Sequence, residues 1–170
     1  KSFLKKFLTS IVFIATFGYG QTDVSGNLSG NETWTVSGSP YIVIDDIYVM
    51  PNDTLTIEPG VVIKIDGDKS IGIKGSLRAI GTNDNYIRFT KNSSTNWDQI
   101  KFDTTNDSSF FDYCIIEFGT DGIKINGSSF SYAPKVRILN SYISNNSGYG
   151  IWTYYNYSGV NRFLSDVQSV

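Results

Sequence analysis

The sequence predicts an all-β repeat protein in which short strands stack into a parallel coil, and three observations support this fold class. Beyond the amino-terminal segment, Val, Ile, Tyr, Phe and Thr alternate with Gly, Asn, Ser and Asp, without sustained helical periodicity. Two apolar residues flank one that can face water at 55–57, 71–73 and 87–89, sixteen residues apart. A longer segment, 113–117, recurs as 140–144. Such repetition predicts units that stack and bury their apolar faces against one another.

Residues 1–20 have the organisation of a secretory signal peptide. Basic residues precede an apolar run at 7–17, and the small residues Gly18 and Gly20 stand before Gln21. The run is shorter than the roughly 20 apolar residues of a membrane-spanning helix. We therefore expect export, a mature amino terminus at Gln21, and no membrane span.

The charge and the cysteine content argue against several classes of binding partner and of catalytic chemistry. Removing the signal peptide takes three lysines and no acidic residue, so the formal net charge falls from −2 to −5. An acidic surface argues against nucleic acid and anionic membrane, because both reward clustered Lys and Arg. Cys114 is the single cysteine, and the chain has no histidine to activate a thiol. We therefore expect no intrachain disulfide and a small core residue at Cys114, not a nucleophile.

Residues 21–50 are expected to cap the coil, and residues 51–170 to form the coils themselves. The cap contains polar turns at 26–27 and 38–40 and a strand-like run at 41–44. Strands are then expected near residues 55–57, 61–65, 71–73, 77–80, 87–89, 100–102, 114–116, 123–125, 136–138, 141–143 and 151–153. The polar loops expected to bulge from the coils are 91–99, 103–109 and 126–134.

Period-two alternation assigns one side of each strand to the coil interior. The expected inward residues are Ile57, Ile73, Phe89, Phe102, Ile116, Ile125, Ile143 and Ile151. Basic residues that alternate with inward positions are expected to face solvent and keep the surface soluble. These are Lys64, Lys74, Arg78, Lys101, Lys124 and Arg137.

The late repeat favours a parallel coil over a sandwich. Residues 113–117 and 140–144 match at an offset of 27, whereas 122–123 and 150–151 match at an offset of 28. The second turn therefore holds one extra residue. A solenoid tolerates insertions confined to turns, because the inward residues keep their places. Short strands that return to one face after variable loops do not suit two-residue hairpins.

Three segments carry a family resemblance: Asn-Glu-Thr-Trp-Thr at 31–35, Ser-Pro-Tyr-Ile-Val at 39–43, and Thr-Leu-Thr-Ile-Glu-Pro-Gly-Val-Val-Ile-Lys at 54–64. With weaker matches as far as residue 153, the chain resembles secreted right-handed parallel β-helix repeat proteins of the pectin-lyase-like superfamily. Its Pro-Gly corner suits a junction between strands, because Pro fixes φ and Gly permits positive φ. The resemblance implies a right-handed parallel β-helix from a large exported or surface protein, often bacterial, and no particular activity.

Acidic residues are the candidates for glycan chemistry. The resemblance implies that enzymes on this fold use either carboxylate groups, or calcium-bound acidic sugars with a basic residue as the proton acceptor. The acidic candidates are Asp45, Asp46, Asp66, Asp68, Asp103, Asp107, Asp112, Glu117 and Asp121. Asp45-Asp46 resembles the paired aspartates of polygalacturonases, but their Gly-His-Gly element is impossible here, and a turn between two strands is expected. Neither Asp66-Gly67-Asp68 nor the loop of Asp103 and Asp107 has the further acidic ligands that calcium needs. We therefore assign no catalytic residue, metal or cofactor.

The most suggestive surface feature is an aromatic run near the end of the chain. If Ile151 points inward, Trp152 and Tyr154 point outward together. Exposed aromatic rings are common platforms for sugar faces, although the rings could instead pack on the next coil or a neighbouring domain. The candidate carbohydrate-binding residues are Tyr149, Trp152, Tyr154, Tyr155 and Tyr157.

Three functions stay open at this point. The first is an exported β-helix module with a binding or structural role at the cell surface or outside the cell, with a polysaccharide or other surface glycan as candidate partner. The second is the amino-terminal portion of a polysaccharide lyase or glycoside hydrolase, and the third is an architectural stalk. We expect no activity from this segment itself, because no cluster joins a base, an acid and a charge stabiliser. Residues 162–167 look like the start of another coil, so we expect a coil truncated at its carboxyl end and further domains in the same chain.

Overall fold

The computed structural model is an all-β solenoid, as predicted, and describes residues 20–103, 107–127 and 134–155. Within these ranges the secondary structure consists of strands and one short 3-10 helix, Val36–Gly38. No helix in the described part of the chain is long and apolar enough to cross a membrane. Residues 1–19 of the predicted signal peptide and residues 162–167 lie outside the described residues.

The named strands pair in parallel throughout and stack into about four turns. They are β1 Thr22–Leu28, β2 Glu32–Trp34, β3 Tyr41–Val49, β4 Thr54–Ile57, β5 Val62–Ile65, β6 Ile71–Ile73, β7 Ser76–Ile80, β8 Ile87–Lys91, β9 Ile100–Phe102, β10 Ser108–Asp112, β11 Cys114–Glu117, β12 Ile123–Gly127, β13 Lys135–Leu139, β14 Tyr142–Ser144 and β15 Ile151–Tyr155.

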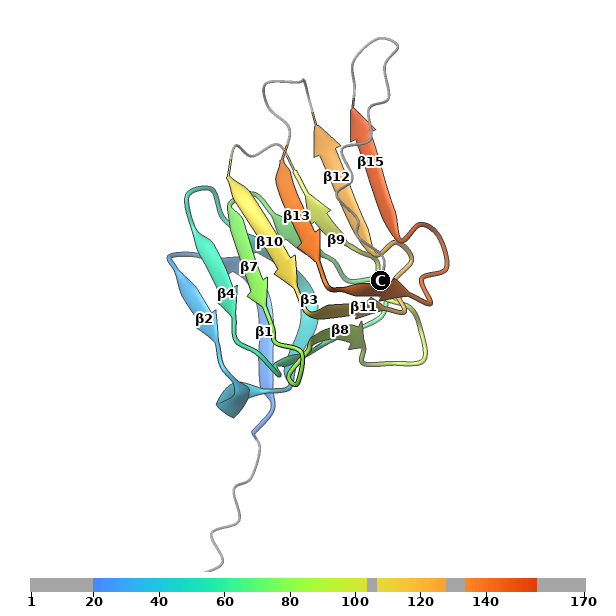
Figure 1. Cartoon of the computed structure of the whole chain (residues 1–170). Helices are drawn as coiled ribbons and strands as arrows, with labels where there is room; N and C mark the ends of the chain where they lie inside the picture. The colour runs from blue at the N-terminus through green and yellow to red at the C-terminus, as the bar shows by residue number, and fades with distance from the viewer. Residues whose placement is uncertain (1–19, 104–106, 128–133, 156–170) are drawn as a thin grey trace, which may run out of the picture.

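Each turn contributes one strand to each of three faces of the solenoid. The five-stranded sheet contains β2, β4, β7, β10 and β13, and Figure 1 shows these strands side by side. The first wing contains β5, β8, β11 and β14, and the second wing contains β6, β9, β12 and β15. Both wings start from β3, whose first half pairs with β5 and whose second half pairs with β6. The strand β1 runs along both halves of β3 and covers the amino-terminal end of the wings.

The coil repeat differs from the sixteen-residue spacing. Residues 55–57, 71–73 and 87–89 lie in β4, β6 and β8, which belong to three different faces, so the prediction that these units stack directly is wrong. Leu55 instead pairs with Leu77, and Ile71 with Ile100. An apolar–polar–apolar unit suits every strand with one buried side, and its spacing alone does not identify its partner.

The late repeat, in contrast, predicts the pairing correctly. Ile116 lies beside Ile143 and Ile123 beside Ile151, at the expected offsets. The turns repeat as well, because Tyr113 and Asn140 have φ angles of 49° and 45°. A match that includes turn conformation is specific, since few non-glycine residues adopt positive φ.

The interior is a continuous column of apolar side chains. Of the predicted inward residues, Ile143 and Ile151 are half-buried and the other six are buried. The amino end is closed by Trp34, which stacks on Tyr41 with a centroid distance of 4.5 Å and an interplanar angle of 7°. Burial of this column is the main source of stability, because parallel strands here have one face sealed from water.

Two segments expected to be bulging loops contribute to the core. The end of the 103–109 loop belongs to β10, where the hydroxyl of buried Ser109 accepts a hydrogen bond of 2.9 Å from the backbone N–H of Leu77. In the 91–99 loop, Trp97 is fully buried and its indole N–H donates to the carbonyl of Glu117 at 2.8 Å. The sequence did not predict either contribution, because Ser109 and Trp97 both stand among polar residues. A buried serine whose hydroxyl is hydrogen-bonded is not recognisable as a core residue from its polarity.

Candidate functional site

The outer side of the second wing carries the exposed aromatic candidates Trp152 and Tyr154. The register aligns Tyr48, Gly72, Lys101, Lys124 and Trp152 across five successive rungs. We call this outer side the polar–aromatic face. Neighbouring strands lie about 4.8 Å apart, so equivalent side chains repeat at that interval along the solenoid axis.

The carboxyl end of the polar–aromatic face contains the predicted aromatic residues. Tyr149 and Trp152 are in contact, with ring centroids 5.7 Å apart and an interplanar angle of 37°. Their exposed fractions are 63% and 36%, and Tyr154, on the same side of β15, is 52% exposed. The structure therefore brings these three together at the surface. Tyr155 ends β15, its side chain is not described, and Tyr157 lies outside the described residues.

A cation lies against the most buried of these rings. The Lys124 ammonium is 4.1 Å from the centroid of the Trp152 ring. Such a contact is attractive because the ring face carries negative potential. It also links Trp152 to its register partner on the neighbouring strand.

The amino end of the same face has a second arrangement of this kind. The Tyr48 ring lies over Gly72, where a Cβ would be 2.5 Å from Tyr48 Cδ1, and the Lys74 ammonium is 4.7 Å from the ring centroid. The Tyr48 hydroxyl donates to Asp46 at 3.3 Å. The negative charge of Asp46 raises the pKa of Tyr48 above its usual value, so this phenol stays protonated.

Paired charges occupy the middle of the face. The Lys101 ammonium lies 2.9 Å from Asp103 Oδ1, and the Asn126 amide donates to the same oxygen at 3.3 Å. Asp103 therefore links Lys101 and Asn126. Asp103 follows β9 and Asp107 precedes β10, and residues between them lie outside the described part of the chain.

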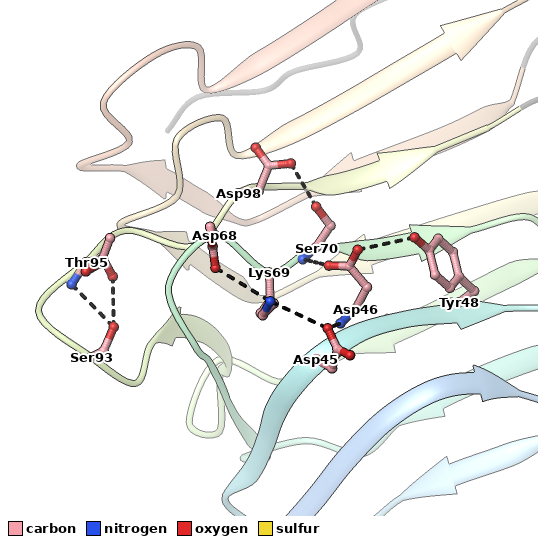
Figure 2. Close-up of polar contacts among 9 residues, drawn as sticks. All are labelled: Asp45, Asp46, Tyr48, Asp68, Lys69, Ser70, Ser93, Thr95 and Asp98. Atoms are coloured by element: carbon pink, nitrogen blue, oxygen red, sulfur yellow. Dashed lines mark hydrogen bonds and ion pairs between the residues drawn. The ribbon is translucent and has the colours of Figure 1, made fainter.

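Figure 2 shows an acidic turn at the edge of the second wing, centred on Lys69. The Lys69 ammonium lies 3.5 Å from Asp45 Oδ1 and 3.7 Å from Asp68 Oδ1. Asp68, and after it Asp45, raises the pKa of Lys69, because both carboxylates favour its charged form. A lysine that stays protonated is a poor proton acceptor, so this cluster does not supply the base of a lyase.

The remaining acidic groups in Figure 2 hold backbone and side chains in place. Asp46 accepts a hydrogen bond from the backbone N–H of Ser70 at 2.8 Å, and Asp98 accepts one from the Ser70 hydroxyl at 2.8 Å. Asp45 and Asp46 were expected to form a turn between two strands. That prediction is wrong in detail, because both lie within β3, between its two pairing regions.

Four other acidic side chains also have structural contacts. The Asn92 amide donates to Asp66, and the Asn140 amide donates to Asp112. The Arg88 guanidinium pairs with Glu117, and the backbone N–H of Tyr149 donates to Asp121. In the described ranges, no group of three or more His, Cys, Asp or Glu side chains is arranged to hold a metal ion. The Asp66-Gly67-Asp68 segment is a turn, with Asp68 at a φ of 61°.

Cys114 is a core residue. Its thiol is buried and donates to the carbonyl of Ala79 at 3.3 Å. Burial raises the pKa of Cys114 to about 12, because the interior disfavours the charged thiolate. The group therefore stays a neutral thiol at physiological pH and is a poor nucleophile.

Sequence reasoning missed a second aromatic cluster, on the outer side of the first wing. Tyr86 meets Tyr113 edge to face at a centroid distance of 5.6 Å, and meets Tyr142 at 5.8 Å. A signal was present, because Tyr86 and Tyr113 are separated by the same 27 residues as the late repeat. Tyr142 occupies an outward position of β14.

Comparisons with known proteins give one local similarity. Protein bark beetle of Drosophila melanogaster is 44% identical over 59 residues, which is 35% of this chain and 2% of that protein. The chain thus matches a very small part of that relative. No family model matches the sequence, and no solved structure matches it.

Proposed function

We propose that the protein is an exported β-solenoid module that binds glycans outside the cell through the carboxyl end of its polar–aromatic face. The single observation that carries this proposal is the exposed contact pair of Tyr149 and Trp152. Large aromatic side chains that meet at the surface without being buried are uncommon in a soluble domain and indicate a contact site.

The geometry suits the apolar faces of sugar rings. Tyr149 and Trp152 are tilted by 37°, and Tyr154 extends the aromatic surface along β15. Positions on a strand are more rigid than positions on a loop, so a ligand loses little affinity to ordering of the protein. One ring contact contributes about 1 kcal/mol, so a single patch binds weakly and several modules are needed for high affinity.

An architectural role is the second candidate. Most acidic side chains in the described residues stabilise turns or neighbouring rungs, as Asp46, Asp98 and Asp121 do. A stalk requires this kind of rung-to-rung bonding and no ligand. Ligand binding distinguishes the two candidates.

Glycan-array binding by the purified protein tests the proposal, with Trp152→Ala and an Arg137→Ala control on the exposed side of β13. We expect weak binding by the wild-type and control proteins and a reduced signal in Trp152→Ala. Absence of any binding, or a Trp152→Ala signal equal to that of the wild-type protein, contradicts the proposed site. Amino-terminal sequencing of secreted material tests export, for which Gln21 is the expected first residue.

A further inference from the structure

We infer that the outer side of the first wing is a second glycan-binding site, for a neutral sugar, so that one module cross-links two glycan chains. This inference rests on the proposed function but uses different residues. The second site consists of Tyr86, Tyr113 and Tyr142 with the neighbouring Arg88–Glu117 ion pair. We call it the tyrosine site.

Three successive rungs converge at the tyrosine site. Tyr86 immediately precedes β8, Tyr113 immediately precedes β11, and Tyr142 begins β14. Tyr86 contacts both other rings, and Tyr142 is 57% exposed. Contacts from Tyr86 position the Tyr142 ring while leaving most of its surface to solvent, which is the condition for stacking a ligand.

Strand register places a guanidinium on the same side of the first wing as Tyr142. Arg88, Ile115 and Tyr142 are aligned on adjacent strands, and Arg88 pairs with Glu117 from the strand between β8 and β14. Sugar rings present an apolar face and a rim of hydroxyl groups. An exposed phenol ring suits the face, and the Arg88 guanidinium, whose side chain is 41% exposed, offers donors to adjacent hydroxyls.

Charge favours a neutral ligand at the tyrosine site. The Arg88 cation is matched by the Glu117 carboxylate, so the pair has no net charge. The Trp152 site differs, because the Lys124 ammonium lies on its indole ring. The two sites therefore differ in charge as well as in position.

The most exposed ring of the tyrosine site, Tyr142, and the Trp152 ring lie on different wings of the last described rung. Tyr142 is outward on β14, Trp152 is outward on β15, and the turn at 145–150 separates the two strands. Two separate sites on one rigid body hold two glycan chains at once, and binding to a polymer gains avidity from both.

Binding and turbidity measurements test this inference, with soluble neutral β-glucan, xylan and mannan as probes. The variants are Trp152→Ala, Tyr142→Ala, the double variant, and Tyr142→Phe as a control that keeps the ring. We expect two sites per wild-type molecule and one in each single variant, with apparent affinity for the polymer lowered roughly a hundredfold. Wild-type protein and Tyr142→Phe make the polymer solution turbid, whereas neither single alanine variant does.

Each outcome separates the two claims. If Trp152→Ala abolishes binding and Tyr142→Ala changes nothing, the tyrosine site is wrong and the proposed function stands. If Tyr142→Ala abolishes binding and Trp152→Ala changes nothing, the Trp152 site and the cross-linking are wrong. If none of the probes binds, both claims are overturned. Thermal unfolding checks that the variants fold, and Tyr142→Gln replaces Tyr142→Ala if the latter unfolds.

Discussion

The interior of the solenoid differs between its middle rungs and the last described rung. Ile116 in β11 is fully buried, whereas its register partner Ile143 in β14 is half-buried, although both are inward isoleucines 27 residues apart in the same repeat. The strand β11 has a neighbour on each side, and β14 has one neighbour among the described residues. Burial of an inward position thus depends on the rungs above and below it.

The amino-terminal end is closed in a way that the last described rung is not. There β1 runs along β3, and Trp34 stacks on Tyr41, so that Val43 is fully buried in the first rung. In β13 the inward residues Val136 and Ile138 are only partly buried. Edge strands and apolar ends are contact surfaces, so the two ends are expected to respond differently to mutation.

Replacing Ile73 by Asp is expected to have the largest effect. Ile73 is fully buried in β6, and the substitution buries a carboxylate without a partner. The cost is several kcal/mol, comparable with the whole stability of a small domain. Circular dichroism should show loss of the folded state, whereas Ile143→Asp, at a half-buried position in the last described rung, should retain it. Equal losses would break the comparison between the rungs.

Alanine substitutions at register partners measure the same difference on a finer scale. Ile116→Ala is expected to lower the free energy of unfolding by about 3 kcal/mol, because the vacated space lies in a closed interior. Ile143→Ala should cost about half as much, since part of its side chain is already in water. Urea denaturation measures both values, and a larger cost at Ile143 would contradict the account.

Gly72→Ala tests the outer side of a middle rung. The new methyl group would lie 2.5 Å from Tyr48 Cδ1, so the tyrosine ring has to move off the strand. We expect a loss of about 1–2 kcal/mol, as in other overpacked sites. The double variant with Tyr48→Ala should recover most of the loss in a thermal melt, and failure to recover would show that Gly72 is needed for another reason.

Lys74→Glu is expected to have the smallest effect, although it is adjacent to Ile73. The Lys74 ammonium lies over the Tyr48 ring at the surface, and its loss should change stability by about 0.5 kcal/mol or less. Thermal shifts of Ile73→Asp and Lys74→Glu are to be compared directly. Similar shifts would refute the assignment of Ile73 to the interior and of Lys74 to the surface.

The candidate site was only partly predictable. Period-two alternation placed Trp152 and Tyr154 outward, and the structure adds the contacts of Trp152 with Tyr149 and Lys124. The tyrosine site escaped notice because its rings come from three rungs, and rings distant in sequence meet only when the register is known. Which strands pair depends on the lengths of the loops between them, and these lengths vary from rung to rung. The residues of a single strand therefore do not identify its partner.

By itself the sequence determined the fold class, the direction in which most strand side chains point, and the 27-residue offset of the late rungs. Those properties follow from local alternation and from turn residues, which act within a few positions. Only the tertiary structure decided that 55–57, 71–73 and 87–89 lie on different faces, that residues 108–112 form a strand, and that Trp97 is buried. Each of these depends on which rung lies alongside, because burial and hydrogen bonding are shared between strands distant in sequence.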